Sequence, residues 1–340
     1  MNISTRGRLL LKRHKIALVL VLILIAGEIA IRLADPKLND LTYYQFENIG
    51  TYRRPEFLED AELFWMPPTR FQGQIDQARA YGGENLIYVF GGSIAFGAQT
   101  KKNFSEHLQD MLDAAGRPGR VVNFAYGGYS SYQCLKLCQR VLRQRVPRIV
   151  VLCNGYNDAS RISNTSDKVA AQKNRSLPLR TLYYLNRVKL FAGFRSLLLA
   201  ARNDLNRYYK FGSSSQAPVT RVPLADYDQN LSMFVELEQE RKFSLVLVSQ
   251  AMPMLKSEKQ LDDYFLLAQA QAGADRGVYF ADVRPLFQDY RQKHNIEYMD
   301  HTHRDRDALF ADTLCHPTEL GHQLYAQAIF NTLVESGLLN

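Results

Sequence analysis

Apolar and polar positions follow two alternating patterns from residue 84 to the end of the chain. Five short, mostly apolar runs are typical of buried strands. They are separated by longer segments whose apolar residues stand three and four apart, the pattern of a helix with one face on a core. The expected strands are LIYVF (86–90), RVVNF (120–124), RIVVLCNG (148–155), FSLVLVSQ (243–250) and GVYFADV (277–283). This alternation predicts an α/β fold with a mostly parallel five-stranded sheet, covered by helices on both sides.

The helices expected between the strands include FSEHLQDMLDAAG (104–116), SSYQCLKLCQRVLRQ (130–144) and LDDYFLLAQAQAG (261–273), and the last helix starts after Pro317. On this last helix we expect His322 on the solvated side. The earlier stretch FWMPPTRFQGQ (64–74) predicts extended or turning chain because of its two adjacent prolines.

The N-terminal segment has a basic part followed by an apolar part. Residues 1–15 carry five Lys or Arg, and an uninterrupted apolar run extends from Ile16 to Gly27. We expect residues 16–34 to be an uncleaved transmembrane signal anchor, because no A-x-A-like cleavage site follows the run. The basic cluster then stays in the cytoplasm, and the rest of the chain lies on the far side of the inner membrane, in the periplasm. Whether the anchor is cleaved stays open.

The remaining organisation follows from the anchor and the sheet. Residues 35–83 are expected to link the anchor to the globular domain and pack on it, and residues 84–340 form that domain. An insertion at about 159–225 interrupts the alternation between the third and fourth strands. From Lys173 to Lys210 it holds nine Lys or Arg, one acid and several aromatic residues. It is either a pair of surface helices with a solvated basic face, or a cap or surface for anionic headgroups or an acidic glycan.

Composition adds only broad limits. The formal net charge is +8 and 46% of the residues are hydrophobic, as in a folded chain with a large core. The four cysteines are too few for a disulfide scaffold and lack zinc-site spacing. We expect no metal, no organic cofactor and no nucleic-acid partner.

Four segments carry the candidate chemistry. Strand one ends at FGGSIAFG with Ser93, strand two at NFAYGGYS with Gly128, and strand three at NGYND with Asn157. The segment ADTLCHPTELGH, with His316, follows the last strand. Ligands of open parallel sheets bind at the carboxyl ends of the strands, so these residues are expected to meet there.

A serine, a histidine and hydrogen-bond donors are what acyl transfer requires. Ser93 would attack an acyl carbonyl, and His316 would take its proton. The backbone N–H groups of Ser93 and Gly128 and the side-chain amide of Asn157 would stabilise the oxyanion of the tetrahedral intermediate.

These segments resemble the four sequence blocks of the SGNH, or GDSL, hydrolase family, in which Ser, Gly, Asn and His follow one another in this order. The N-terminal anchor resembles a membrane-anchored bacterial branch. The resemblance implies a flavodoxin-like three-layer α/β/α fold. It departs from the family at the acid: the family pattern is D-x-x-H, whereas Asp312 stands four residues before His316. We assign Asp312 the orienting role, with Asp300, Asp307 or a Ser–His dyad as alternatives.

The resemblance implies a membrane-anchored serine esterase. Its expected substrates are O-acyl esters, with O-acetyl groups on a cell-envelope or exported polysaccharide as the first expectation. Two alternatives stay open. The same residues would serve an O-acyltransferase, in which a second hydroxyl replaces water. The displaced acid is also compatible with a non-catalytic glycan-binding or assembly protein.

Overall fold

A computed structural model describes residues 3–34, 58–161, 165–177, 181, 185, 188, 190–191, 219–275, 277–299 and 307–339. Its centre is a sheet of five parallel strands in the order β4-β3-β5-β6-β7. The strands are β3 (Leu86–Gly91), β4 (Arg120–Asn123), β5 (Ile149–Cys153), β6 (Ser244–Val248) and β7 (Val278–Ala281). The predicted five-stranded parallel sheet with intervening helices is therefore confirmed.

The order of the strands fixes where a ligand site can form. The chain runs from β3 to its neighbour β4 and then crosses to β5 on the other side of β3. The loops that follow β3, β4 and β5 therefore leave the sheet at the carboxyl ends of these strands and run in different directions. The space between such loops is the usual position of a binding crevice in parallel sheets. The three segments with Ser93, Gly128 and Asn157 are those loops.

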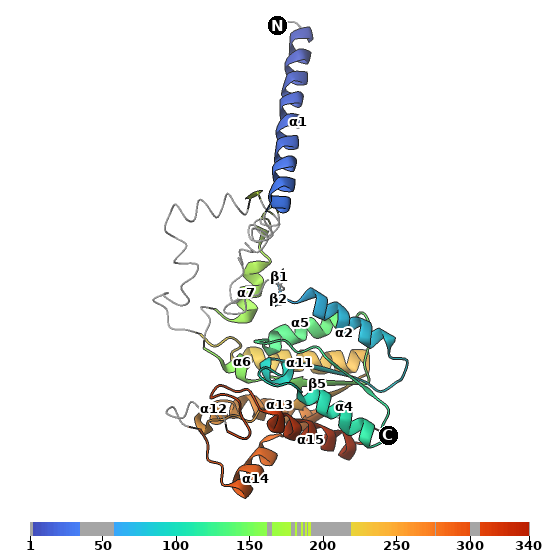
Figure 1. Ribbon diagram of the computed structural model, residues 1–340, viewed down its shortest axis with the longest axis vertical. Helices are drawn as coiled ribbons and strands as arrows, with labels where there is room; N and C mark the ends of the chain where they lie inside the picture. The colour runs from blue at the N-terminus through green and yellow to red at the C-terminus, as the bar shows by residue number, and fades with distance from the viewer. Residues whose placement is uncertain are drawn as a thin grey trace.

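Helices cover both faces of the sheet (Figure 1). One apolar core lies under α2 (Pro68–Ala80), α5 (Ser131–Val141) and α11 (Leu224–Arg241). The other lies under α4 (Phe104–Ala114) and α15 (Glu319–Glu335), whereas α13 (Asp262–Ala274) packs beside α11 and β7 and contributes to both cores. The remaining short helices in the described part are α3 (Ser93–Phe96), α6 (Tyr156–Ala159), α7 (Asp167–Asn174) and α12 (Leu255–Lys259).

Two regions differ from the sequence-based expectation. A small antiparallel pair, β1 (Leu58–Asp60) and β2 (Phe64–Met66), precedes α2. The extended chain predicted for residues 64–74 is wrong from residue 68 onward, because Pro68 is the first residue of α2. Proline is well suited there, since the first helical N–H has no intrahelical partner to lose. The helix α14 (Arg284–His294), which starts with Arg284-Pro285, was also not predicted.

The N-terminal helix α1 (Ile3–Ala34) extends away from the domain (Figure 1). Among the residues that the structure describes, no helix is long and apolar enough to cross a membrane. The transmembrane segment predicted for residues 16–34 is therefore not confirmed. The uninterrupted apolar run ends at Glu28, whose carboxylate accepts a hydrogen bond from the N–H of Leu190 at 2.9 Å. Most of the basic part of the predicted insertion lies outside the described residues.

Candidate active site

Ser93 opens α3 just after strand β3, and the residue is only 7% exposed. The two preceding glycines are required by close neighbours. A Cβ at Gly91 would lie 2.6 Å from the carbonyl oxygen of Cys153 on β5, and a Cβ at Gly92 would clash with Nδ2 of Asn157. Side chains would not fit at either position, so the glycine pair lets neighbouring segments close around the serine.

The Asn157 amide lies beside the serine because of these contacts. Asn157 is on α6, just after β5, and its Nδ2 donates to the carbonyl of Tyr129 at 3.0 Å. The same nitrogen packs against Gly92, so an N–H donor is next to the Ser93 peptide. Gly128, one residue before Tyr129, has a φ of +76°, a conformation that glycine adopts without strain. The structure thus brings together three of the predicted residues.

His316 and Asp312 form a separate, directly bonded pair. The Nδ1 atom of His316 lies 2.5 Å from Oδ2 of Asp312, and the two side chains are 15% and 20% exposed. The four-residue separation that departs from the family pattern therefore does not keep the acid from the histidine. The bond to Nδ1 leaves the opposite nitrogen, Nε2, as the atom that can take up a proton.

The loop that carries this pair absorbs the extra residue by wrapping around the carboxylate. Oδ1 of Asp312 accepts backbone N–H bonds from Leu314, Cys315 and His316 at 3.0, 3.1 and 3.2 Å. The N–H of Ala311 bonds to the carbonyl of His316 at 2.8 Å, which closes the loop. One carboxylate thus shapes the turn with one oxygen and orients the imidazole with the other.

The electrostatics of the pair favour an ionised acid. Burial raises the pKa of the Asp312 carboxyl, but the hydrogen bond and charge of His316, with the backbone N–H bonds, outweigh it and lower this pKa to about 2. Asp312 is therefore a carboxylate at neutral pH and is able to stabilise a positively charged imidazole.

Cys315 connects the two halves of the site. Its sulfur lies 4.0 Å from the Ser93 hydroxyl oxygen, and the residue is buried next to His316 in sequence. Burial raises the pKa of this thiol far above its usual range, so it stays protonated and does not act as a nucleophile. All four cysteines are free and buried. Within the described residues no hydrogen bond joins Ser93 to the His316 ring; such bonds often tighten only when substrate is bound.

The other acids considered from the sequence are placed elsewhere. Asp307 bonds to the N–H groups of Leu309 and Phe310 at 2.6 Å, and its other oxygen is 3.5 Å from Arg291. Asp300 lies outside the described residues. Among the side chains that the structure describes, no group of three or more His, Cys, Asp or Glu is arranged to hold a metal ion.

Sequence reasoning missed one residue that contacts the acid. Gln99 donates from Nε2 to Oδ2 of Asp312 at 2.7 Å, and this nitrogen is 3.4 Å from Nδ1 of His316. Its backbone has a φ of +65°, which is uncommon for a residue with a side chain. The only signal in the sequence was its place six residues after Ser93, in the same loop.

The prediction for His322 was wrong. This residue is fully buried rather than solvated, in ring contact with Phe104. The reason is that α15 packs along α4 on the side that carries His322 and Tyr325.

Residues 89–324 match the model of the GDSL-like lipase/acylhydrolase family. The chain belongs to this family. As a GDSL-like hydrolase it is a carboxylic ester hydrolase, as the resemblance of its four sequence blocks implied. No curated protein matches the chain significantly.

Solved structures similar to this GDSL-like hydrolase are distant in sequence. The α/β hydrolase LAE5 from the metagenome of Lake Arreo, Spain, is 17% identical, with 76% of this chain and 98% of that chain covered and a TM-score of 0.45. The acetyl xylan esterase AlAXEase is 14% identical over 72% and 98%, with a TM-score of 0.47. The acetylxylan esterase Axe2 from Geobacillus stearothermophilus is 15% identical over 75% and 95%, with a TM-score of 0.47.

Proposed function

We propose that the hydrolase is a serine esterase in which Ser93 is the nucleophile, His316 the general base and acid, and Asp312 the residue that orients the histidine. The observation that carries this proposal is the 2.5 Å bond between Asp312 and Nδ1 of His316, on the loop whose Cys315 contacts the Ser93 hydroxyl. The close approach of Asn157 to Gly92 supports the second half of the site, the oxyanion hole.

The proposed reaction has two steps. Oγ of Ser93 attacks the ester carbonyl while Nε2 of His316 takes the hydroxyl proton. The negative oxygen is bound by the N–H groups of Ser93 and Gly128 and by the Asn157 amide. The C–O bond to the alcohol breaks and His316 returns the proton to the leaving oxygen. Water then attacks the acyl-serine by the same route and releases the acid.

The proposed substrate is a short acyl ester, such as acetate, on an envelope or exported polysaccharide. The nearly complete burial of Ser93 favours a small acyl group. A groove of about 690 Å³ between α2 and α4, lined by none of the five proposed site residues, would suit a hydroxyl-rich alcohol through polar side chains such as Arg70, Asn103, Glu106 and Asn123. This groove borders α3, because Asn123 donates to the carbonyl of Ala95 at 2.8 Å.

A fluorophosphonate probe and an ester series test this proposal. The purified full-length chain is treated with the probe and the adduct is mapped by mass spectrometry, with Ser93→Ala and His316→Ala as controls. We expect an adduct on Ser93 that is lost in both variants, and faster hydrolysis of 4-nitrophenyl acetate than of the octanoate. An adduct at another residue, or none in the folded protein, would contradict the proposed mechanism.

The products distinguish hydrolysis from acyl transfer. Acetylated polysaccharide is incubated with the enzyme in the presence of an excess of an unacetylated sugar. Release of free acetate supports the esterase, whereas acetate found on the added sugar identifies a transferase that uses the same residues.

For the location, we propose that the N-terminus is cytoplasmic and that α1 holds the catalytic domain at the outer side of the inner membrane. The large apolar side chains from Ile16 to Ile25 support this, because they are between 50% and 61% exposed. Fractionation after a carbonate wash, with and without residues 1–34, tests it. Recovery of the full-length chain in the wash would contradict membrane attachment.

A further inference from the structure

A buried ion pair lies directly behind the proposed oxyanion hole. Arg221 and Asp167 have side chains that are only 3% and 0% exposed. The guanidinium binds the carboxylate with two nitrogens, Nε to Oδ1 at 3.2 Å and Nη2 to Oδ2 at 2.8 Å. This two-point contact fixes the plane of the guanidinium group.

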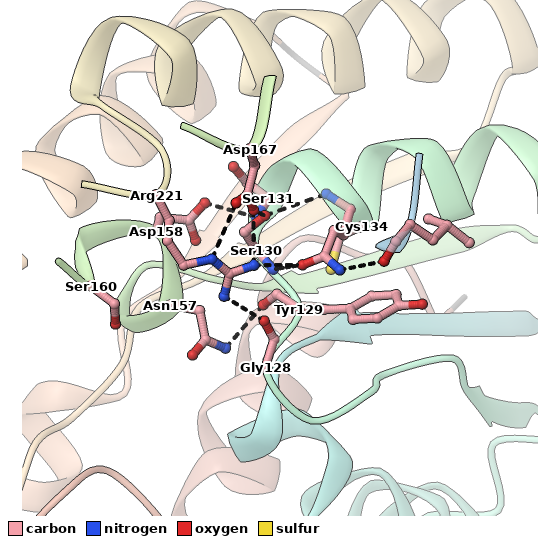
Figure 2. Close-up of polar contacts among 12 residues, drawn as sticks. Gly128, Tyr129, Ser130, Ser131, Cys134, Asn157, Asp158, Ser160, Asp167 and Arg221 are labelled. Atoms are coloured by element: carbon pink, nitrogen blue, oxygen red, sulfur yellow. Dashed lines mark hydrogen bonds and ion pairs between the residues drawn. The ribbon is translucent and has the colours of Figure 1, made fainter. Parts of the chain in front are cut away.

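The same guanidinium has a third partner in the oxyanion segment. Nη1 of Arg221 donates to the carbonyl of Gly128 at 2.7 Å, as Figure 2 shows at the centre of the network. Nη2 also donates to Oε1 of Gln133 at 2.8 Å. Asp167 in turn accepts the hydroxyl of Ser130 at 2.6 Å. The pair is therefore hydrogen-bonded to the chain at Gly128 and at the start of α5.

These contacts act on a residue with unusual conformational freedom. Gly128 has a positive φ and no side chain to anchor it. The next carbonyl along the chain, that of Tyr129, accepts the Asn157 amide at 3.0 Å. The carbonyls of two consecutive residues are thus each held by a side chain. Arg221 binds the carbonyl of Gly128, and Asn157 binds the carbonyl of Tyr129.

We propose that Arg221, oriented by Asp167, is a positioning residue of the oxyanion hole. Its bond to the Gly128 carbonyl fixes the peptide plane between Gly128 and Tyr129. This restrains the backbone torsion angles of Gly128, which set the direction of the Gly128 N–H, and it steadies the next carbonyl, to which the Asn157 amide is bonded. The proposal rests on the proposed esterase function. It adds two residues that stand outside the four sequence blocks and act through Gly128 rather than on the substrate.

The position of the pair in the chain extends this role. Asp167 and Arg221 stand near the two ends of the insertion at 159–225, and the N–H of Asp167 donates to the carbonyl of Arg221 at 2.8 Å. The N–H of Arg221 donates to the carbonyl of Ser160 at 3.0 Å. The pair closes the base of the insertion and ties that base to the oxyanion segment.

A second arginine on the same side of the sheet provides a matched control. Arg140 on α5 binds both oxygens of Asp60 at 2.6 and 2.8 Å, as Arg221 binds Asp167. Its other described partner is Glu62, and none of these groups belongs to the oxyanion segment. Removal of Arg140 therefore breaks an arginine–carboxylate pair without touching Gly128.

The test compares Arg221→Lys, Arg221→Met and Arg140→Met in the full-length enzyme. For each variant, kcat and KM for 4-nitrophenyl acetate and the melting temperature are measured. We expect both Arg221 variants to lose 10- to 100-fold in kcat with KM changed less than threefold, because oxyanion binding acts in the transition state. Arg140→Met is expected to lower the melting temperature and to keep kcat within twofold. Wild-type kcat in either folded Arg221 variant overturns the proposal.

A second variant and one further measurement cover the case in which Arg221→Met fails to fold. If Arg221→Met does not fold, Arg221→Lys retains the charge and still lacks the planar fork, so its kcat is the test. Amide hydrogen exchange at residues 126–131 is compared between wild type and Arg221→Lys, and faster exchange confined to this segment is expected. An inactive wild-type enzyme would overturn the proposed function and, with it, the oxyanion role of Arg221, whereas unchanged exchange in an active enzyme would overturn the positioning role alone.

Discussion

The proposed site contains two pairs of side chains that are built in opposite ways. Asp312 and His316 lie four residues apart on one short loop and are 20% and 15% exposed. Asp167 and Arg221 are 54 residues apart in sequence, and their side chains are 0% and 3% exposed. One pair is local and partly open to water, and the other is long-range and buried.

The difference corresponds to what each pair has to do. His316 must take up a proton and release it, and a partly exposed loop lets alcohol and water reach it. The oxyanion donors must not reorganise during the reaction, since preorganised dipoles stabilise the transition state best. A buried network that joins distant segments provides that rigidity. The local pair and the buried network can therefore be tested by separate substitutions.

The largest effect is expected from Asp312→Asn, which keeps the shape of the local pair and removes its charge. Without the carboxylate, the imidazole loses the group that sets its tautomer and stabilises its protonated form. We expect kcat to fall by roughly 10³-fold. The measurement is steady-state hydrolysis of 4-nitrophenyl acetate, with the melting temperature as a check on folding. A loss below fivefold would identify a Ser–His dyad instead.

A smaller loss is expected from Gly92→Ala, which disturbs the buried half. The added Cβ would clash with Nδ2 of Asn157 and lie 3.0 Å from the carbonyl oxygen of Tyr129, so the amide has to move. Loss of one oxyanion donor costs about 10²-fold in kcat. Gly273→Ala is the matched control, because its Cβ would meet no atom within 4 Å. Equal kcat values in the two variants would place the Asn157 amide outside the oxyanion hole.

How much of this site was predictable from sequence depends on how local each feature is. The strands and the segments with Ser93, Gly128 and Asn157 were predictable, because apolar periodicity and turn residues are local signals. The contact between Asp312 and His316 was not predictable. Its distance to His316 depends on how the backbone wraps around the carboxylate, and spacing alone does not decide that.

The long-range contacts were beyond sequence reasoning. Arg221 is 93 residues from Gly128 and stands in a segment without a recognisable motif. Nothing in the local pattern distinguishes it from Arg161 and Arg175, two exposed arginines of the insertion. The error at His322 has the same origin, because the packing partner of α15 is α4, more than two hundred residues earlier.

An effect on stability is expected from the acid that ties the buried half together. Asp158 is fully buried and accepts the N–H groups of Ser131 and Gly155 at 2.8 and 3.1 Å. Burial raises its pKa to about 6, although the Ser131 hydrogen bonds and the charge of Arg221 act against this shift. The folded state therefore holds a proton that the unfolded state releases between about pH 4 and 6.

Asp158 and Asp312 change the free energy of unfolding with pH in opposite directions. The Asp158 contribution lowers the free energy of unfolding as pH rises from 4 to 6, by on the order of 3 kcal/mol relative to an Asp158→Asn variant. The lowered pKa of Asp312 makes its contribution disappear as pH falls from about 4 toward 2. Urea unfolding of wild type, Asp158→Asn and Asp312→Asn at pH 2 to 7 measures both. A constant difference between wild type and Asp158→Asn across this range would contradict the raised pKa.

The smallest effect is expected from Gln99→Ala, which removes the second side-chain donor to Asp312. Gln99 binds the same oxygen, Oδ2, that faces His316, so it restrains the carboxylate without carrying charge. The local loop still holds the other oxygen through three backbone N–H bonds. We therefore expect kcat to fall only about two- to fivefold, with KM unchanged.

Gln99→Gly separates the lost bond from the strain of the positive φ, because glycine relieves that strain. If the hydrogen bond matters, both variants lose the same kcat while only Gln99→Gly retains full stability. A loss as large as that of Asp312→Asn would instead show that the exposed pair depends on Gln99 as strongly as we propose the buried half depends on Arg221.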